Sequence, residues 1–240
     1  MLDLSHCDSL SFDCYGTLID WESGLLRAFA QLLERPLDEL DKVDLFSRYA
    51  RIEAELESPP YIRYREVLHC AAIQIARELN VSLPLDAGER FAESIRDWEP
   101  FPDTVSALER LAKRYRLYIL SNVDDDLFAS TARKLEVQFA GTITAEQVGS
   151  YKPNPRNFER LLEVVGSRER HVHVAESLFH DHLPAQQMGI RSIWINRGRN
   201  QGEGGASGKA EAKYDLELPD LASLADLAVG FPNKDKAAHT

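Results

Sequence analysis

The amino-acid sequence predicts an α/β protein in which a parallel sheet carries an inserted all-helical domain. Beyond residue 98, short apolar runs typical of buried strands alternate with helical patterns, and this repetition builds a parallel sheet with helices on both faces. Between the first and second strand patterns, residues 20–97 show only helical periodicity. A chain of 240 residues with a hydrophobic fraction of 44% can bury a full globular core.

The strand and helix patterns follow one another in a regular order. We expect strands at about 9–13, 117–120, 142–144, 172–175 and 192–195. The helices between the later strands should cover about 104–115, 125–135, 155–165 and 182–188.

The inserted region should contain four helices, because its apolar periodicity is interrupted by Pro36, Pro59-Pro60 and Pro84. The expected ranges are about 22–34, 40–57, 62–79 and 86–97. Helices inserted over the carboxyl edge of a sheet are typical of a lid. The chain then divides into a core (1–19 and 98–232), a helical cap (20–97) and a frayed tail (233–240), with a flexible Gly-rich loop at 198–213.

Charge and cysteine content exclude several classes of partner. The net charge of −11 disfavours nucleic acid and anionic membrane surfaces. The sequence has no run of 18 apolar residues and does not begin with a basic segment followed by an apolar one, so we expect neither a membrane span nor a signal peptide. Cys7, Cys14 and Cys70 are a sparse, odd set typical of reduced thiols, which indicates a cytoplasmic protein.

A candidate nucleophile ends the first strand pattern. In the segment Leu10-Ser11-Phe12-Asp13-Cys14-Tyr15-Gly16-Thr17-Leu18, an apolar run is followed by an aspartate and then by a glycine that permits a sharp turn. Ligands of open α/β sheets bind at the carboxyl ends of strands, where a carboxylate can attack an electrophile and form an ester that water releases. The alternative is an aspartate that only caps the turn.

Three further segments follow in order. They are Ile119-Leu120-Ser121-Asn122, Tyr151-Lys152-Pro153 and Val174-Ala175-Glu176-Ser177-Leu178-Phe179-His180-Asp181. Together with the Asp13 segment they resemble the four signatures of the haloacid dehalogenase (HAD) superfamily. The resemblance covers nearly the whole chain. It implies a Rossmann-like core with an inserted helical cap and a hydrolase whose nucleophile is Asp13.

Tyr15 decides which HAD reaction the resemblance favours. HAD phosphatases typically carry a second aspartate two residues after the nucleophile, and it protonates the poor alkoxide leaving group. Tyrosine, with an ordinary pKa of about 10, is a weak acid for this role. A halide needs no proton to leave, so the sequence is more similar to the L-2-haloacid dehalogenase branch, which attacks the α-carbon of a small carboxylic acid.

The resemblance to that branch also implies roles for other residues. Ser121 and backbone amides near Tyr15 would hold the substrate carboxylate, Asn122 would contact the leaving group, and Lys152 would neutralise Asp13. Thr17 matches in type and place, and Asp181 would orient the hydrolytic water. In the cap, Arg48 matches the arginine that receives the leaving halide. The alternatives are loop capping for Ser121 and Asn122, and solvent-exposed surface positions for Lys152 and Arg48.

Two departures from the dehalogenase pattern leave the leaving group open. Phe158 replaces an expected tyrosine, and Glu176 stands where phosphatases place a Mg²⁺ carboxylate. Glu176 could instead pair with Lys152 or receive a cationic substrate, since the same branch contains a hydrolase that opens L-azetidine-2-carboxylate by C–N cleavage.

We expect no cofactor for attack at carbon. The alternatives are a Mg²⁺-dependent phosphatase using Asp13, Glu176 and Asp181, and a non-catalytic HAD scaffold. The expected partner is a small carboxylate substrate, and a homodimer is left open.

Overall fold

The computed structural model describes residues 2–58, 60–198 and 211–229. The expected tail lies outside these residues, as does most of the expected loop at 198–213. Within them, six parallel strands form one sheet in the order β3-β2-β1-β4-β5-β6. The strands are β1 (Ser9–Phe12), β2 (Arg116–Ser121), β3 (Gly141–Thr144), β4 (His171–Ala175), β5 (Arg191–Ile195) and β6 (Leu216–Leu218). The α/β fold with its parallel sheet is therefore confirmed, and β6 is a strand that the sequence analysis missed.

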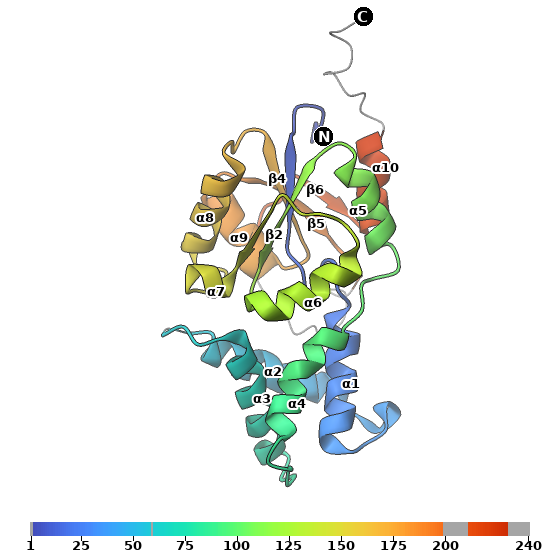
Figure 1. The fold of residues 1–240 in the computed structure, drawn as a ribbon, viewed down its shortest axis with the longest axis vertical. Helices are drawn as coiled ribbons and strands as arrows, with labels where there is room; N and C mark the ends of the chain where they lie inside the picture. Colours follow the sequence, from blue (N-terminus) through green and yellow to red (C-terminus); the bar gives the residue numbers. More distant parts are fainter. Residues whose placement is uncertain (1, 59, 199–210, 230–240) are drawn as a thin grey trace, which may run out of the picture.

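Helices cover both faces of the sheet, as expected (Figure 1). Successive side chains of β2 point to opposite faces of the sheet. Leu117 and Ile119 belong to the core beneath α5 and α10, and Tyr118 and Leu120 pack with α8 and α9 on the other face. The core helices are α5 (Thr104–Ala112), α6 (Asp125–Leu135), α7 (Ala145–Val148), α8 (Pro155–Val165), α9 (Leu183–Gln187) and α10 (Leu221–Val229), with a single π turn, η3 (Leu178–His182), before α9.

The region between β1 and β2 forms a helical insertion at the carboxyl edge of the sheet (Figure 1). Asp20 and Asp41 begin its first two helices by accepting hydrogen bonds from the amides of Ser23 and Asp44. The expected helix at 86–97 divides into an α-helix and a short 3₁₀ segment. The elements are α1 (Trp21–Leu33), η1 (Leu37–Glu39), α2 (Lys42–Leu56), α3 (Tyr64–Glu78), α4 (Ala87–Glu93) and η2 (Ser94–Asp97).

A core carboxylate caps a helix of the insertion and so fixes it over the sheet. Asp124, fully buried, accepts hydrogen bonds from the amides of Tyr64 and Arg65 at the start of α3, both at 2.9 Å. The helix has no side-chain cap of its own at Arg63. A carboxylate at this end satisfies two unpaired amides and complements the helix dipole. Asp124 therefore joins the two parts of the molecule where they meet.

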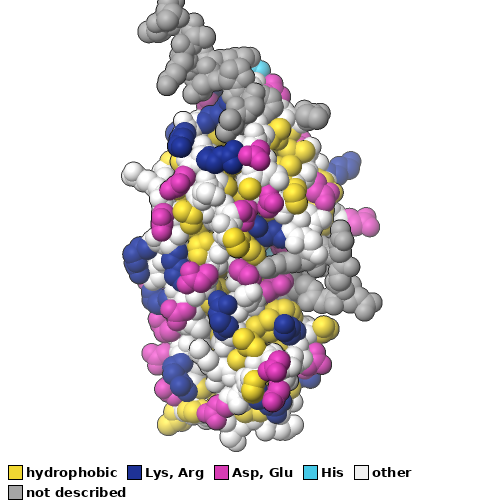
Figure 2. All heavy atoms as spheres, turned by 90° about the vertical axis from the view of Figure 1, so that its right-hand side faces the viewer, with side chains coloured by type: hydrophobic (Ala, Val, Ile, Leu, Met, Phe, Trp, Pro, Cys, Tyr) yellow, Lys and Arg dark blue, Asp and Glu magenta, His cyan; other side chains and the backbone are white. Residues whose placement is uncertain are grey.

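Basic and acidic side chains are mixed on the surface. Figure 2 shows Lys and Arg side chains interspersed with Asp and Glu on the face that it presents, without a continuous basic area. Cys7 and Cys14 are buried and Cys70 is exposed, and all three are free thiols. None of the described helices is both long enough and apolar enough to cross a bilayer.

Candidate active site

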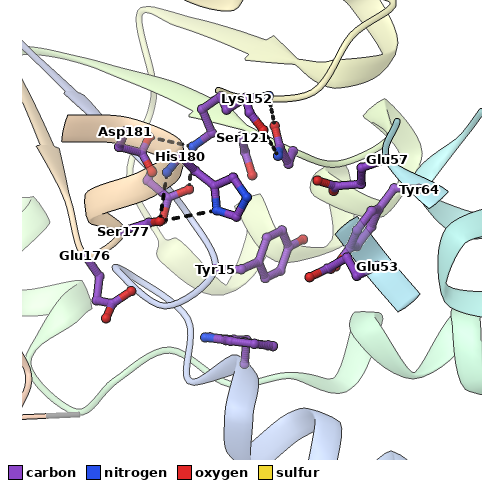
Figure 3. Close-up of a pocket in the computed structure, with 13 residues that line it drawn as sticks. Tyr15, Glu53, Glu57, Tyr64, Ser121, Lys152, Glu176, Ser177, His180 and Asp181 are labelled. Atoms are coloured by element: carbon purple, nitrogen blue, oxygen red, sulfur yellow. Dashed lines mark hydrogen bonds and ion pairs between the residues drawn. The ribbon is translucent and has the colours of Figure 1, made fainter. Parts of the chain in front are cut away.

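A small pocket of about 70 Å³ lies between the carboxyl edge of the sheet and the helical insertion (Figure 3). It forms beside β1, where the strand order turns from β2 on one side to β4 on the other, which is the usual ligand position in such sheets. The pocket is lined by Asp13, Tyr15, Trp21, Glu53, Glu57, Tyr64, Ser121, Asn122, Lys152, Glu176, Ser177, His180 and Asp181. Most of the residues expected from sequence thus meet in one place.

Asp13 follows β1 directly and is held by two donors. Gly16, with φ of +97°, allows the chain to turn back so that Thr17 reaches the aspartate. Thr17 Oγ1 donates to Asp13 Oδ2 at 2.8 Å, and Lys152 Nζ lies 2.8 Å from Asp13 Oδ1. Burial raises the pKa of Asp13, and the charge of Lys152 opposes that rise. Both carboxylate oxygens are therefore oriented, as a nucleophile requires.

Lys152 bridges two carboxylates. Its Nζ donates to Asp13 Oδ1 at 2.8 Å, to Asp181 Oδ1 at 2.7 Å and to the carbonyl of Leu120 at 3.0 Å, so all three ammonium donors are used. Burial would lower the pKa of Lys152, but the charges of Asp13 and Asp181 outweigh burial and hold it above its ordinary value. Lys152 is thus a permanent cation in the site.

Asp181 is fully buried and has one engaged oxygen. Oδ1 lies 2.7 Å from Lys152 Nζ and 2.9 Å from His173 Nε2. Among the described residues, Oδ2 has no hydrogen-bond partner. Burial would raise the pKa of Asp181, but Lys152 and the hydrogen bond with His173 together hold it below its usual range. Asp181 is therefore an ionised carboxylate with one oxygen available to a water molecule.

Tyr15 lines the pocket, but its hydroxyl is engaged elsewhere. The Tyr15 hydroxyl lies 3.0 Å from Thr131 Oγ1 on α6. Burial raises the pKa of Tyr15 well above its ordinary value. In this arrangement Tyr15 is a wall of the pocket and a poor proton donor.

Ser121 and Asn122, at the end of β2, have different surroundings. Ser121 Oγ is buried and, among the described residues, unpartnered, so it can bind a substrate. Asn122 instead binds the backbone of Lys152 twice: its Oδ1 accepts from the Lys152 amide at 2.7 Å and its Nδ2 donates to the Lys152 carbonyl at 3.1 Å. Asn122 therefore positions the lysine as well as lining the pocket.

Glu176 and Arg48 occupy contrasting places. Glu176 is buried, lines the pocket and donates its backbone amide to Thr17 Oγ1 at 2.9 Å. Arg48 does not line the pocket. It binds Asp44 at 2.7 Å and Glu78 at 2.8 Å on the cap, so the structure does not bring it to the site as a halide receptor. The reason is local: the neighbouring acidic side chains pair with the guanidinium.

The cap contributes two carboxylates that the sequence analysis missed. Glu53 on α2 and Glu57, which follows the last residue of α2, project into the pocket opposite Asp181 and Glu176 (Figure 3). Glu53 accepts hydrogen bonds from the hydroxyls of Tyr49 at 2.9 Å and Tyr64 at 2.8 Å. Burial raises the pKa of Glu53, and burial together with the charge of Glu53 raises that of Glu57 well above its ordinary value.

Their spacing of four residues places both glutamates on one face of a helix, and this was the available sequence signal. His180 is a further lining residue that was missed. Burial lowers its pKa to about 4, so it is a neutral imidazole.

The phosphatase alternative requires Mg²⁺ at the site. A hard cation would need oxygen ligands from Asp13 and Glu176. The ammonium of Lys152 already lies 2.8 Å from Asp13 Oδ1. In this arrangement the ammonium of Lys152 takes the place of a cation at Asp13 Oδ1.

The geometry agrees with comparisons with known proteins. A curated relative, (S)-2-haloacid dehalogenase 4A of Burkholderia cepacia, is 25% identical over 198 residues, which are 80% of this chain and 84% of that protein. A glyceraldehyde 3-phosphate phosphatase of Methanothermobacter thermautotrophicus is 36% identical over 101 residues, but these cover only 40% of this chain and 45% of that protein.

The fold is shared with L-2-haloacid dehalogenase from Xanthobacter autotrophicus, solved with chloropropionic acid covalently bound. The TM-score is 0.76 at 19% identity, over 94% of this chain and all of that one (100%). Residues 8–189 match the haloacid dehalogenase-like hydrolase family. The chain therefore belongs to the haloacid dehalogenase-like hydrolases.

Proposed function

We propose that this hydrolase uses Asp13 to displace a substituent from the α-carbon of a small 2-substituted carboxylic acid, through an ester on Asp13. The observation that carries the proposal is the bond between the Tyr15 hydroxyl and Thr131, at 3.0 Å. It leaves no acid two residues beyond the nucleophile, so the leaving group must depart without a proton from that position. The fold shared with a dehalogenase that holds chloropropionic acid covalently supports the same chemistry.

The proposed reaction has two steps, and different site residues act in each. Asp13 attacks through one oxygen, and the bond between the α-carbon and the substituent breaks, so the substituent departs with the electron pair. Water then attacks the carbonyl carbon of the ester and gives one proton to Asp181, which passes that proton to the alkoxide as it departs, so that the 2-hydroxy acid is released. Asp13 is regenerated as a carboxylate when the second proton of the water is lost to solvent. Lys152 offsets the charge of both carboxylates. The unpartnered Ser121 Oγ offers a hydrogen bond to the substrate carboxylate.

A specific observation favours a protonated amine over a halide as the leaving group. Glu53, Glu57 and Glu176 line the pocket together with Asp13 and Asp181, and Lys152 is the single lysine or arginine among the described lining residues. In the transition state a departing nitrogen keeps part of its positive charge, whereas a departing halogen gains negative charge. Ionised carboxylates therefore favour the first by electrostatics, and a cationic substrate in turn favours the ionised forms of Glu53 and Glu57. Arg48, which would receive a halide, lies elsewhere.

L-azetidine-2-carboxylate combines these features as a candidate substrate. Its ring nitrogen is already protonated, so attack of Asp13 on the α-carbon opens the ring and the nitrogen leaves as a neutral amine that stays in the product. Hydrolysis of the ester then gives 4-amino-2-hydroxybutanoate. Ring strain lowers the barrier to breaking the C–N bond.

Parallel assays test the proposal. 2-Chloropropionate, L-azetidine-2-carboxylate and p-nitrophenyl phosphate would each be offered to the protein with and without EDTA. We expect turnover of a carbon substrate that survives chelation, with the azetidine processed more efficiently than the haloacid. Turnover of the phosphate ester alone, lost on chelation, would replace this proposal with the phosphatase alternative.

A further inference from the structure

Four polar side chains form a buried column beneath the site. Ser9 and Ser11 on β1 lie in register with His171 and His173 on β4, and all four are at most 2% exposed. Their sequence neighbours on both strands point into the opposite, apolar face of the sheet. The column faces α8, whose Phe158 packs edge-on against His173 with ring centroids 5.3 Å apart. Phe158 thus offers no polar group that competes with the column.

The column is one unbroken chain of hydrogen bonds that ends at Asp181. Ser9 Oγ lies 2.8 Å from His171 Nδ1, and His171 Nε2 lies 2.8 Å from Ser11 Oγ. Ser11 Oγ lies 2.7 Å from His173 Nδ1, and His173 Nε2 lies 2.9 Å from Asp181 Oδ1. A connected buried polar network of this kind holds its members in a single arrangement.

The ionised carboxylate sets the direction of every bond. Asp181 can only accept, so His173 donates through Nε2 and, when neutral, accepts through Nδ1 from the Ser11 hydroxyl. Ser11 then accepts from His171 Nε2, and His171 Nδ1 accepts from Ser9. Burial lowers the pKa of His171 to about 3, which keeps that ring neutral. With the hydrogen bonds in these directions, the hydroxyls of Ser9 and Ser11 and the Nε2–H groups of both histidines each donate one hydrogen bond.

We propose that His173 is a positioning residue for the second step, the hydrolysis of the Asp13 ester, and that Ser11 fixes the tautomer through which it acts. The inference rests on the proposed function. Oδ1 of Asp181 has two donors, Lys152 and His173, so the proton taken from water must add to Oδ2. When Asp13 becomes an ester it loses its charge and no longer balances Lys152. The bond from His173 still holds Asp181 in place at that moment.

The test separates the two steps by rapid-quench mass spectrometry of Asp13, with 2-chloropropionate and L-azetidine-2-carboxylate as substrates. In His173→Leu we expect ester formation to stay within about threefold of the wild type and ester hydrolysis to slow by about 100-fold, as misplacement of a reacting group would cause. The ester should then accumulate. His173→Gln, whose amide N–H can replace Nε2–H, should recover most of the rate. Ser11→Ala, which does not touch Asp181, should also slow hydrolysis of the ester.

His182 provides a matched control. It is equally buried and lies next to Asp181 in sequence, but its ring contacts Ser192 Oγ at 2.9 Å and the carbonyl of Ala175 at 3.0 Å. We expect His182→Gln to hydrolyse the ester at the wild-type rate. The inference would be overturned if His182→Gln slowed ester hydrolysis as much as His173→Leu does. It would also be overturned if His173→Leu hydrolysed the ester at the wild-type rate.

A measurement without substrate distinguishes failure of the inference from failure of the proposed function. Nitrogen-15 NMR of the histidines should show His173 protonated at Nε2 and unprotonated at Nδ1 in the wild type, and a mixture of tautomers in Ser11→Ala. A wild-type His173 protonated at Nδ1 would overturn the column as drawn. The absence of any Asp13 ester in the wild type, with the tautomer as expected, would instead contradict the proposed function and with it the role of His173 in ester hydrolysis.

Discussion

The hydroxyl of Tyr15 lies 3.0 Å from Oγ1 of Thr131, and this contact joins the turn after β1 to α6. In the same position a phosphatase of this superfamily would present a carboxylic acid to the leaving group. The Tyr15 hydroxyl is hydrogen-bonded to Thr131, and burial raises its pKa. Tyr15 therefore cannot assist a leaving group that needs a proton. Halides and protonated amines need none.

Tyr15→Phe therefore tests whether the hydroxyl takes part in the chemistry. We expect kcat to change by less than about tenfold, because no proton transfer to the leaving group is lost. The free energy of unfolding should fall by about 1 kcal/mol, since a buried hydrogen bond is removed. Thr131→Val removes the other half of the bond and is the control for stability. A loss of kcat of about 100-fold or more in Tyr15→Phe would show that the hydroxyl acts as an acid after all.

Lys152→Met should be strongly destabilising. It leaves Asp13 and Asp181 buried without their shared cation, a change that costs about 3–5 kcal/mol. Lys134→Met, which removes an exposed pair with Glu99, is the control and should cost about 1 kcal/mol or less. Urea unfolding measures both.

The dependence of these losses on pH follows from the pKa of Asp181. In the wild type the pKa of Asp181 is below its ordinary value of 3.8. Asp181 therefore stabilises the folded protein at pH values above 3.8, and this contribution is lost as the pH falls toward the lowered pKa. Without Lys152 the buried carboxylates prefer to be protonated, so the variant should lose stability as the pH rises above that value. A deficit that does not shrink in acid would contradict the assigned ion bridge.

Glu57→Gln tests the leaving group. A cationic substrate favours the ionised form of Glu57 against the effect of burial, and the resulting negative charge near the reacting nitrogen needs to contribute only about 1.4 kcal/mol to change a rate tenfold. We expect kcat/KM for L-azetidine-2-carboxylate to fall by about tenfold or more, and kcat/KM for 2-chloropropionate to stay the same or to rise. Glu55→Gln, on the exposed side of α2, is the matched control for the loss of one carboxylate from the same helix. Unchanged azetidine turnover in Glu57→Gln, with efficient dehalogenation, would leave an ordinary dehalogenase.

The sequence predicted the core of the site because the sheet edge gathers the ends of strands that are distant in the chain. Asp13, Ser121 and Glu176 each follow or end a central strand, so strand patterns alone place them together. The bounds of α6 and α8 agree with the expected ranges of about 125–135 and 155–165, and the ends of α8 are marked by Asn154, Pro155 and Gly166. Strand β6 was missed because its three residues, Leu216–Leu218, give too short a pattern.

The cap side of the site was predicted poorly, for a physical reason. Which face of α2 meets the core depends on how the inserted helices dock, and that is set by contacts such as Asp124 with the start of α3. A helical pattern does not contain this information. Arg48 was therefore expected in the pocket, whereas Glu53 and Glu57 are the side chains that reach it. The alternation of His171 and His173 with valines was an available sequence signal of a polar column on one sheet face, and the sequence analysis did not use it.

The central claim, that Asp13 forms an ester with substrate carbon, is tested most directly by a single turnover in ¹⁸O-labelled water. Enzyme in excess over L-azetidine-2-carboxylate or 2-chloropropionate would be quenched after one turnover, and the product and the peptide containing Asp13 would be weighed by mass spectrometry. Because water attacks the ester carbonyl, the account predicts an unlabelled hydroxyl in the product and one ¹⁸O atom in Asp13. Label in the product hydroxyl and none in Asp13 would show direct attack by water and contradict the account.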